Sequence, residues 1–295
     1  MKLGKMKFSR NDKGKNDFPK IFKGIILISL VILAVFLAGC QEKEEKPQEL
    51  SGELAIKSCK GLLPLIQEWA RLFMEKYPNV KINISGTKCG EVIKSVGKDE
   101  IDIGFIGREM KPNEKEKYPD IKQVVIGRKS IAIIVHPNNP VNELSLEQIA
   151  KIFAGDITNW KEVGGFDKDI NVIIREEGCE REILEKLVMK PYGKTITANA
   201  SVKQSYEEIK ATVSKDESSI GYILLPYIDD TVKALKIDGV EPTIQNVLSG
   251  NYPIIKTFYL ITKGEPSELE KAFIDFVLSE EGQKVLEDMG YIRVK

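Results

Sequence analysis

A chain of 295 residues that is 42% hydrophobic and 30% charged has enough apolar material for one large core or two moderate ones, which argues against a disordered polypeptide. Its formal charge is zero, but residues 1–39 hold eight basic and two acidic side chains, so the remainder has an acidic excess. A nucleic-acid-binding protein normally shows the opposite sign over its folded part, and we expect no nucleic-acid partner.

The first predicted element is an export signal at residues 1–39. A basic stretch precedes an apolar run of about 16 residues, which is shorter than the roughly 20 residues of a membrane-spanning helix. The run ends in Leu37-Ala38-Gly39-Cys40, which resembles a bacterial-type lipobox, in which small residues admit the peptidase and the cysteine thiol takes a diacylglyceryl chain. An uncleaved signal anchor is the alternative. Either reading places the folded part at the extracytoplasmic face of the cell membrane, with residues 40–51 as a solvated tether. The lipobox reading makes this tether lipidated.

Beyond residue 52, short apolar or β-branched runs alternate with helical patterns, which predicts an α/β fold. In the first part we expect strands at 54–56, 80–84, 101–106, 123–126 and 130–135, and helices at 62–77 and 90–96. A helix at 144–153, opened by Ser145, begins the second part. It is followed by strands at 170–174, 220–225 and 253–262 and by helices at 181–189, 205–214, 267–278 and 281–289.

Two long strands bracket a self-contained middle segment, which predicts one lobe inserted into another. Residues 52–134 plus 256–295 would form lobe 1, and residues 135–255 would form lobe 2. In α/β architectures of this kind, ligands bind in the crevice at strand ends and helix N-termini. We therefore expect the ligand cleft between the two lobes.

Five segments of this part of the chain form a recognisable series. They are LLPLIQEWARLFMEKYPNVKINISG, DEIDIGFIGREM, IAIIVHPNNPVNELSLEQIAKIFAGDITNWKEVGG, IGYILLPYI and YPIIKTFYLITKG. In this order they resemble the phosphate-type substrate-binding proteins of ABC importers, a family with the two-lobed type II periplasmic-binding fold. The resemblance covers nearly all of residues 52–295. It implies a monomeric receptor that captures a small anion and passes it to an ABC permease in the membrane.

The family encloses its oxyanion with the amides and hydroxyls of three small-residue loops, each leading into a helix. The resemblance places these loops at residues 58–61, 86–90 and 175–181, and it places a ligand-proximal residue at Arg108. Arg175 and Gly178 match the family pattern, whereas most of the usual hydroxyl-bearing residues are absent. The candidate ligand-binding residues are Ser58, Cys59, Lys60, Gly61, Thr87, Lys88, Cys89, Gly90, Arg108, Arg175, Gly178, Cys179, Glu180 and Arg181.

The resemblance also places one cysteine in each of the three loops, namely Cys59, Cys89 and Cys179. Helix N-termini and neighbouring cations would favour their thiolate forms. Three thiolates could hold a metal ion, an iron–sulfur cluster with one open corner, or a metal-containing anion. The alternatives are a Cys59–Cys89 disulfide with Cys179 as a small buried filler, and three unrelated buried thiols.

No catalytic motif is present, and the single histidine, His136, cannot build a histidine-based metal site, so we expect no enzyme. The function predicted first is an extracytoplasmic solute-binding lipoprotein of an ABC importer, which captures phosphate or a related or metal-containing anion. The alternative on the same scaffold is a cysteine-ligated metal or iron–sulfur protein that is not a phosphate receptor. An adhesive or signalling module without a ligand is a third reading.

Overall fold

The computed structural model of this chain describes residues 50–176 and 179–294, with only the backbone described at Cys179. The predicted export signal, the lipobox at Cys40 and nearly all of the tether lie outside the described residues, as does Gly178. Residues 49–295 form one compact unit. Among the described residues, no helix is both long enough and apolar enough to cross a membrane.

One mixed sheet runs through both lobes, in the strand order β2-β1-β3-β11-β4-β8-β6-β7, with β9 paired to β4. Its strands are β1 (Gly52–Cys59), β2 (Val80–Thr87), β3 (Ile103–Ile106), β4 (Ile121–Val135), β6 (Asn171–Arg175), β7 (Ser201–Lys203), β8 (Ser219–Leu224), β9 (Lys233–Ala234) and β11 (Ile255–Lys263). Strand β1 lies parallel to both β2 and β3, whereas β11 is antiparallel to β3 and β4. A small separate sheet pairs β5 (Glu143–Leu144) with β10 (Lys236–Ile237).

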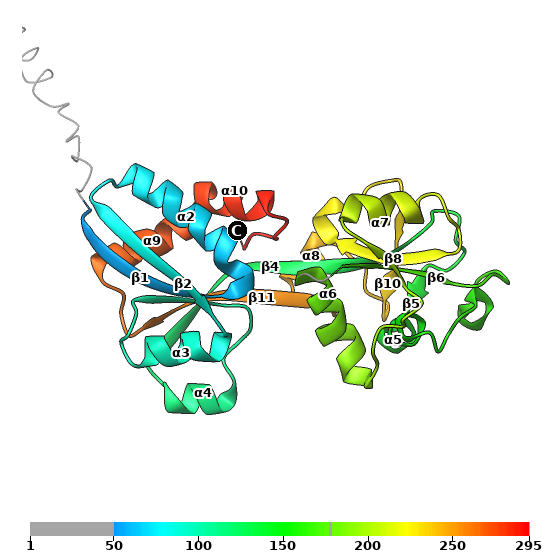
Figure 1. Cartoon of the computed structure of the whole chain (residues 1–295), viewed down its shortest axis with the longest axis horizontal. Helices are drawn as coiled ribbons and strands as arrows, with labels where there is room; N and C mark the ends of the chain where they lie inside the picture. The colour runs from blue at the N-terminus through cyan, green and yellow to red at the C-terminus, as the bar shows by residue number, and fades with distance from the viewer. Residues whose placement is uncertain (1–49, 177–178, 295) are drawn as a thin grey trace, which may run out of the picture. The chain divides into compact units, whose positions relative to one another are not determined.

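Helices cover both faces of the lobe 1 strands, with α2, α9 and α10 above them and α3 and α4 below them in Figure 1. The helices of lobe 1 are η1 (Lys60–Leu62), α2 (Leu63–Lys76), α3 (Cys89–Gly97), α4 (Pro112–Lys117), α9 (Glu268–Leu278) and α10 (Glu280–Asp288). Those of lobe 2 are α5 (Leu146–Ala154), η2 (Trp160–Val163), α6 (Cys179–Ile183), the π-helical segment η3 (Leu184–Met189), η4 (Lys190–Tyr192), α7 (Tyr206–Val213), η5 (Leu225–Tyr227) and α8 (Ile244–Leu248).

Local sequence explains where these helices begin and end, as α5 illustrates. The Ser145 hydroxyl accepts the backbone N–H of Gln148 at 3.1 Å, and the Gln148 side chain accepts the N–H of Ser145 at 2.9 Å. This reciprocal cap satisfies donors that the first turn leaves unpaired. The helix ends at Gly155, which has φ of 80°, a left-handed conformation that glycine adopts without steric cost. The expected helix start at Ser145 is confirmed.

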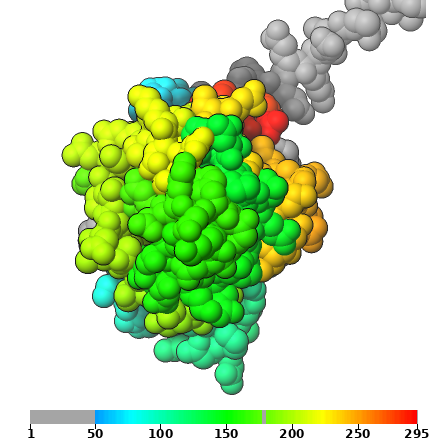
Figure 2. All heavy atoms as spheres, turned by 90° about the vertical axis from the view of Figure 1, so that its right-hand side faces the viewer, coloured from blue at the N-terminus to red at the C-terminus, as the bar shows by residue number. Residues whose placement is uncertain are grey.

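Each lobe has its own hydrophobic core. One core packs α2, α9 and α10 on β1 around the fully buried Trp69, whose indole N–H donates to the carbonyl of Gly282 at 2.7 Å. The other surrounds Trp160, whose N–H donates to the carbonyl of Ser218 at 2.9 Å. Strands β4 and β11 run between the two cores (Figure 1). Figure 2 shows the lobe 2 end, whose facing surface is formed mainly by green and yellow residues from the middle of the chain.

The crossing strand β4 differs from the prediction, because residues 121–135 form one strand where we expected two. Residues 127–129, which lie between the two expected strands, continue the ladder opposite β11. A Cβ atom at Gly127 would lie 2.5 Å from a methyl carbon of Leu286, so a larger residue there would force the Leu286 side chain to move. The predicted helix at 181–189 also differs, since its second half is π-helical.

Candidate functional site

A cavity of about 750 Å³ lies where the two lobes meet. Lobe 1 contributes residues 59–62, 87–90 and 107–109, lobe 2 contributes residues 182, 183, 186 and 187, and β11 contributes residues 255–258. The first two predicted ligand loops therefore come together on one wall of this cavity. They do so because β1 and β2 are parallel neighbours in register, with Cys59 opposite Thr87, so their carboxyl ends meet at one edge of the sheet.

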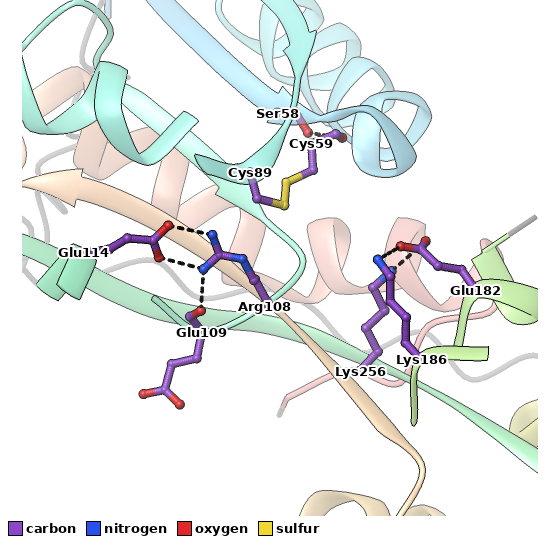
Figure 3. Close-up of a disulfide and its surroundings, with 9 residues drawn as sticks. All are labelled: Ser58, Cys59, Cys89, Arg108, Glu109, Glu114, Glu182, Lys186 and Lys256. Atoms are coloured by element: carbon purple, nitrogen blue, oxygen red, sulfur yellow. Dashed lines mark hydrogen bonds and ion pairs between the residues drawn. A yellow bond between two sulfur atoms is a disulfide. The ribbon is translucent and has the colours of Figure 1, made fainter. Parts of the chain in front are cut away.

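A disulfide joins the two loops, linking Cys59 at the end of β1 to Cys89 at the start of α3 (Figure 3). Their Cα atoms are 5.1 Å apart. A disulfide sulfur carries no thiolate, so the three-thiolate metal site does not exist in this form of the protein. The disulfide is one of the alternatives that the sequence left open. Within residues 50–176 and 179–294, no group of three histidine, cysteine or acidic side chains could hold a metal ion.

Lys60 and Lys88 place one cation in each of these loops. Both side chains are exposed and line the cavity, and neither has an ion-pair partner within the described part of the chain. Backbone N–H groups lie beside them, because the first residues of a helix have no intrahelical hydrogen-bond acceptor. Helix α3 begins at Cys89, directly after Lys88, so its amino end opens on the cavity wall.

Arg108 also lines the cavity, but its charge is already neutralised. Its guanidinium donates two hydrogen bonds of 2.7 Å to the Glu114 carboxylate and a third, of 2.9 Å, to the carbonyl of Glu109 (Figure 3). The hydrogen bonds from Arg108 hold the pKa of Glu114 below its usual value, so this bidentate pair is fully charged at neutral pH. Arg108 is a less available anion ligand than Lys60 or Lys88.

Among the candidate residues whose side chains the structure describes, four do not line this cavity: Ser58, Arg175, Glu180 and Arg181. The hydroxyl of Ser58 is buried and donates to the carbonyl of Cys59 at 3.0 Å. In the third loop, Arg175 donates to Glu180 at 2.8 Å and lies 4.3 Å above the ring of Tyr206. Arg181 donates to Glu185 at 2.9 Å. The side chains in the described part of the third loop are thus paired with residues of lobe 2 or of the crossing strands. They do not line the cavity.

Four charged residues that line the cavity were missed from the sequence, namely Glu109, Glu182, Lys186 and Lys256 (Figure 3). The ammonium of Lys256 lies 3.2 Å from a carboxylate oxygen of Glu182, and Lys186 bonds the other oxygen. A signal for two of them existed, since Lys186 follows Glu182 at helical i,i+4 spacing. Lys256 stands as the first charged residue in an otherwise apolar strand, but its partner is 74 positions away in the chain.

Comparison with known proteins agrees with this architecture. A family model described as a PBP superfamily domain matches residues 45–281. The phosphate-binding protein PstS of Bacillus subtilis is 30% identical over 287 residues, which cover 91% of this chain and 94% of the relative.

Solved structures extend the likeness to three dimensions. An ABC-type phosphate transport receptor from Vibrio cholerae has 26% identity and a TM-score of 0.71, covering 82% of this chain and 99% of the other. A phosphate ABC transporter substrate-binding protein with bound phosphate from Clostridium perfringens has 38% identity and a TM-score of 0.54, covering 83% and 100%. The predicted two-lobed fold is confirmed, and the relatives are transport receptors, not enzymes. This chain belongs to the phosphate-type substrate-binding proteins of ABC importers, within the PBP superfamily.

Proposed function

We propose that this chain is the extracytoplasmic receptor of an ABC importer and captures phosphate in the cavity between its lobes. The observation that supports this most directly is the pair of exposed cations, Lys60 and Lys88, on two adjoining loops of that cavity. The relatives from Bacillus subtilis and Clostridium perfringens are described as binding phosphate. A cationic cavity at the same lobe junction suits the same class of ligand.

A buried phosphate needs a nearly full set of hydrogen-bond donors, because an unpaired charged oxygen is costly away from water. This chain replaces most of the family's hydroxyl residues, so its donors would be the ammonium groups of Lys60 and Lys88, the Thr87 hydroxyl and the amides at the start of α3. Recognition would therefore depend more on charge than on hydroxyl geometry. Other tetrahedral dianions, such as sulfate, should compete more effectively than at a hydroxyl-lined site.

Capture would proceed by rotation of the lobes about β4 and β11, the two strands that run between their cores. Loops 58–61 and 86–90 approach the anion from lobe 1. Closure would bring the end of α6 and η3 to the other side, and the closed form would dock on the permease. A lipid anchor on Cys40 would hold the receptor near that permease, as the lipobox sequence suggests.

The experiment that tests this function is calorimetric titration of phosphate into the full-length chain, purified in detergent and freed of bound anions. We expect saturable binding, which falls by roughly a hundredfold or more when Lys60 and Lys88 are both replaced by alanine, since charge-assisted hydrogen bonds contribute about 1.5–3 kcal/mol each. The matched control is Lys81→Ala with Lys94→Ala, which removes two exposed lysines of lobe 1 that do not line the cavity. Wild-type protein that takes up no phosphate, or loop variants that bind as tightly as the control, would refute the proposal.

A further inference from the structure

Two lysines lie directly opposite each other on the crossing strands. Lys129 of β4 pairs in register with Lys256 of β11. Two like charges directly opposite each other repel, so these lysines would destabilise the pairing of the two strands if nothing compensated their charges. Helix α6 supplies a carboxylate to each: Glu180 lies 3.5 Å from the Lys129 ammonium, and Glu182 lies 3.2 Å from that of Lys256.

The two ion pairs differ in their access to solvent. The side chains of Lys129 and Glu180 are 10% and 4% exposed, so this pair is closed to a dissolved ion. The side chains of Lys256 and Glu182 are 20% and 41% exposed, and both residues line the cavity. Only the second pair can therefore be reached and exchanged by a solute that enters between the lobes.

Glu182 neutralises two cations of the cavity wall at once, because Lys186 bonds the same carboxylate (Figure 3). Its partial burial would by itself raise the pKa of Glu182. The hydrogen bonds and charges of Lys186 and Lys256 lower it by more, so the net shift is downward. A ligand anion arriving at neutral pH therefore meets an ionised carboxylate already in place on these lysines.

We propose that Glu182 is an internal competitor of the ligand, which the captured anion must displace from Lys256 and Lys186. Glu182 then sets the affinity of the site. A dianion can replace the single carboxylate charge and neutralise both lysines, whereas a monoanion only exchanges one charge for another. This inference rests on the proposed capture of phosphate. The opposing idea, that Glu182 accepts a hydrogen bond from hydrogen phosphate, predicts an effect of the opposite sign.

The test is the phosphate affinity of Glu182→Gln, measured by calorimetry on the full-length chain at fixed ionic strength. Glutamine keeps the shape and removes the competing charge, so we expect binding to tighten by roughly twofold to fivefold, the scale of a partly exposed ion pair. The control is Glu147→Gln, which removes an exposed i,i+4 pair with Lys151 in the same lobe, away from the cavity, and should leave the affinity unchanged.

If wild type and the Glu147→Gln control bind phosphate alike, and Glu182→Gln binds it equally well or more weakly, the inference is wrong and the proposed function still stands. Absence of phosphate binding in all three proteins overturns the proposed function, and the inference with it. If Glu182→Gln fails to fold, Glu182→Asp serves instead, because the shorter side chain keeps a carboxylate but draws it away from Lys256. Tighter binding by Glu182→Asp then supports the inference, and equal or weaker binding refutes it.

Discussion

At the scale of single residues, the most demanding feature is the buried carboxylate of Glu180, which is 3% exposed. Arg175 and Lys129 both approach it, and each cation also lies over an aromatic ring, Tyr206 for Arg175 and Tyr291 for Lys129. Removing a carboxylate from water costs several kcal/mol unless it is paired and hydrogen-bonded, and here two cations satisfy it. The cluster fixes the start of α6 against the crossing strand β4.

Glu180→Gln should destabilise the protein by about 2–4 kcal/mol, because breaking a buried ion pair leaves the partner charge uncompensated, and the partial exposure of Arg175 moderates the loss. Urea denaturation followed by circular dichroism measures the change. Glu185→Gln is the control, since it removes a more exposed pair with Arg181 on the same segment and should change the unfolding free energy by about 0.5 kcal/mol or less. Equal stability of the two variants would contradict the role assigned to Glu180.

At the scale of elements, the disulfide between Cys59 and Cys89 connects the end of β1 to the start of α3. It therefore fixes the spacing of the two loops that carry Lys60 and Lys88. The residues that it joins are 30 positions apart, so the bond also restricts a sizeable loop of the unfolded chain. One covalent bond thus serves both stability and the geometry of the anion site.

Replacing both Cys59 and Cys89 by serine should lower the unfolding free energy by about 3–4 kcal/mol, the loss of loop-closure restriction expected for this separation. Phosphate affinity should fall as well, because the two cationic loops would no longer be held together. Guanidinium denaturation and calorimetry, each with and without a thiol reductant, measure the two effects. The reductant should lower both the unfolding free energy and the phosphate affinity of wild type, and it should leave both unchanged in the double variant. If the reductant does not affect wild type, the disulfide does not have this role.

Much of the architecture could be predicted from sequence at this scale, because it depends on local periodicity. The apolar spacing that predicted α2 and the capping residues that predicted α5 report directly on a buried face and a helix start. The continuity of β4 was not predictable locally, because residues 127–129 pair with β11, which is far along the chain. Lys60 and Lys88 entered the candidate site through the family resemblance, which aligns their loops with the family's ligand loops. The rest of the site could not be predicted where partners are distant, as for Lys256 with Glu182 or Arg175 with Tyr206.

At the scale of the whole molecule, we expect the basic N-terminal segment and the acidic remainder beyond residue 39 to occupy different environments. A basic segment ahead of an apolar run belongs at the cytoplasmic side of a membrane during export. The binding lobes would then face the outside, where a disulfide persists. The observed Cys59–Cys89 bond is consistent with that compartment.

Cys40→Ser separates the two readings of the N-terminus. If Cys40 carries the lipid and marks the cleavage site, wild type should fractionate with membranes as a shortened, acylated chain, and the variant should lose the acyl mass. Intact-mass spectrometry of the membrane fraction measures both. A full-length, unmodified wild-type chain in membranes, unaffected by the substitution, would instead establish an uncleaved anchor.

The register of β4 and β11 has a mechanical consequence. These two antiparallel strands are hydrogen-bonded to each other where they pass between the cores, and their register shifts at a bulge between Phe258 and Tyr259. Such a ribbon resists stretching, because extended backbone is already near its full length, but it twists readily. The bulge itself lies within the lobe 1 core, where Phe258 is buried. We therefore expect the spacing between the lobe centres to stay nearly constant on closure while their relative angle changes, which is the behaviour of a torsion hinge.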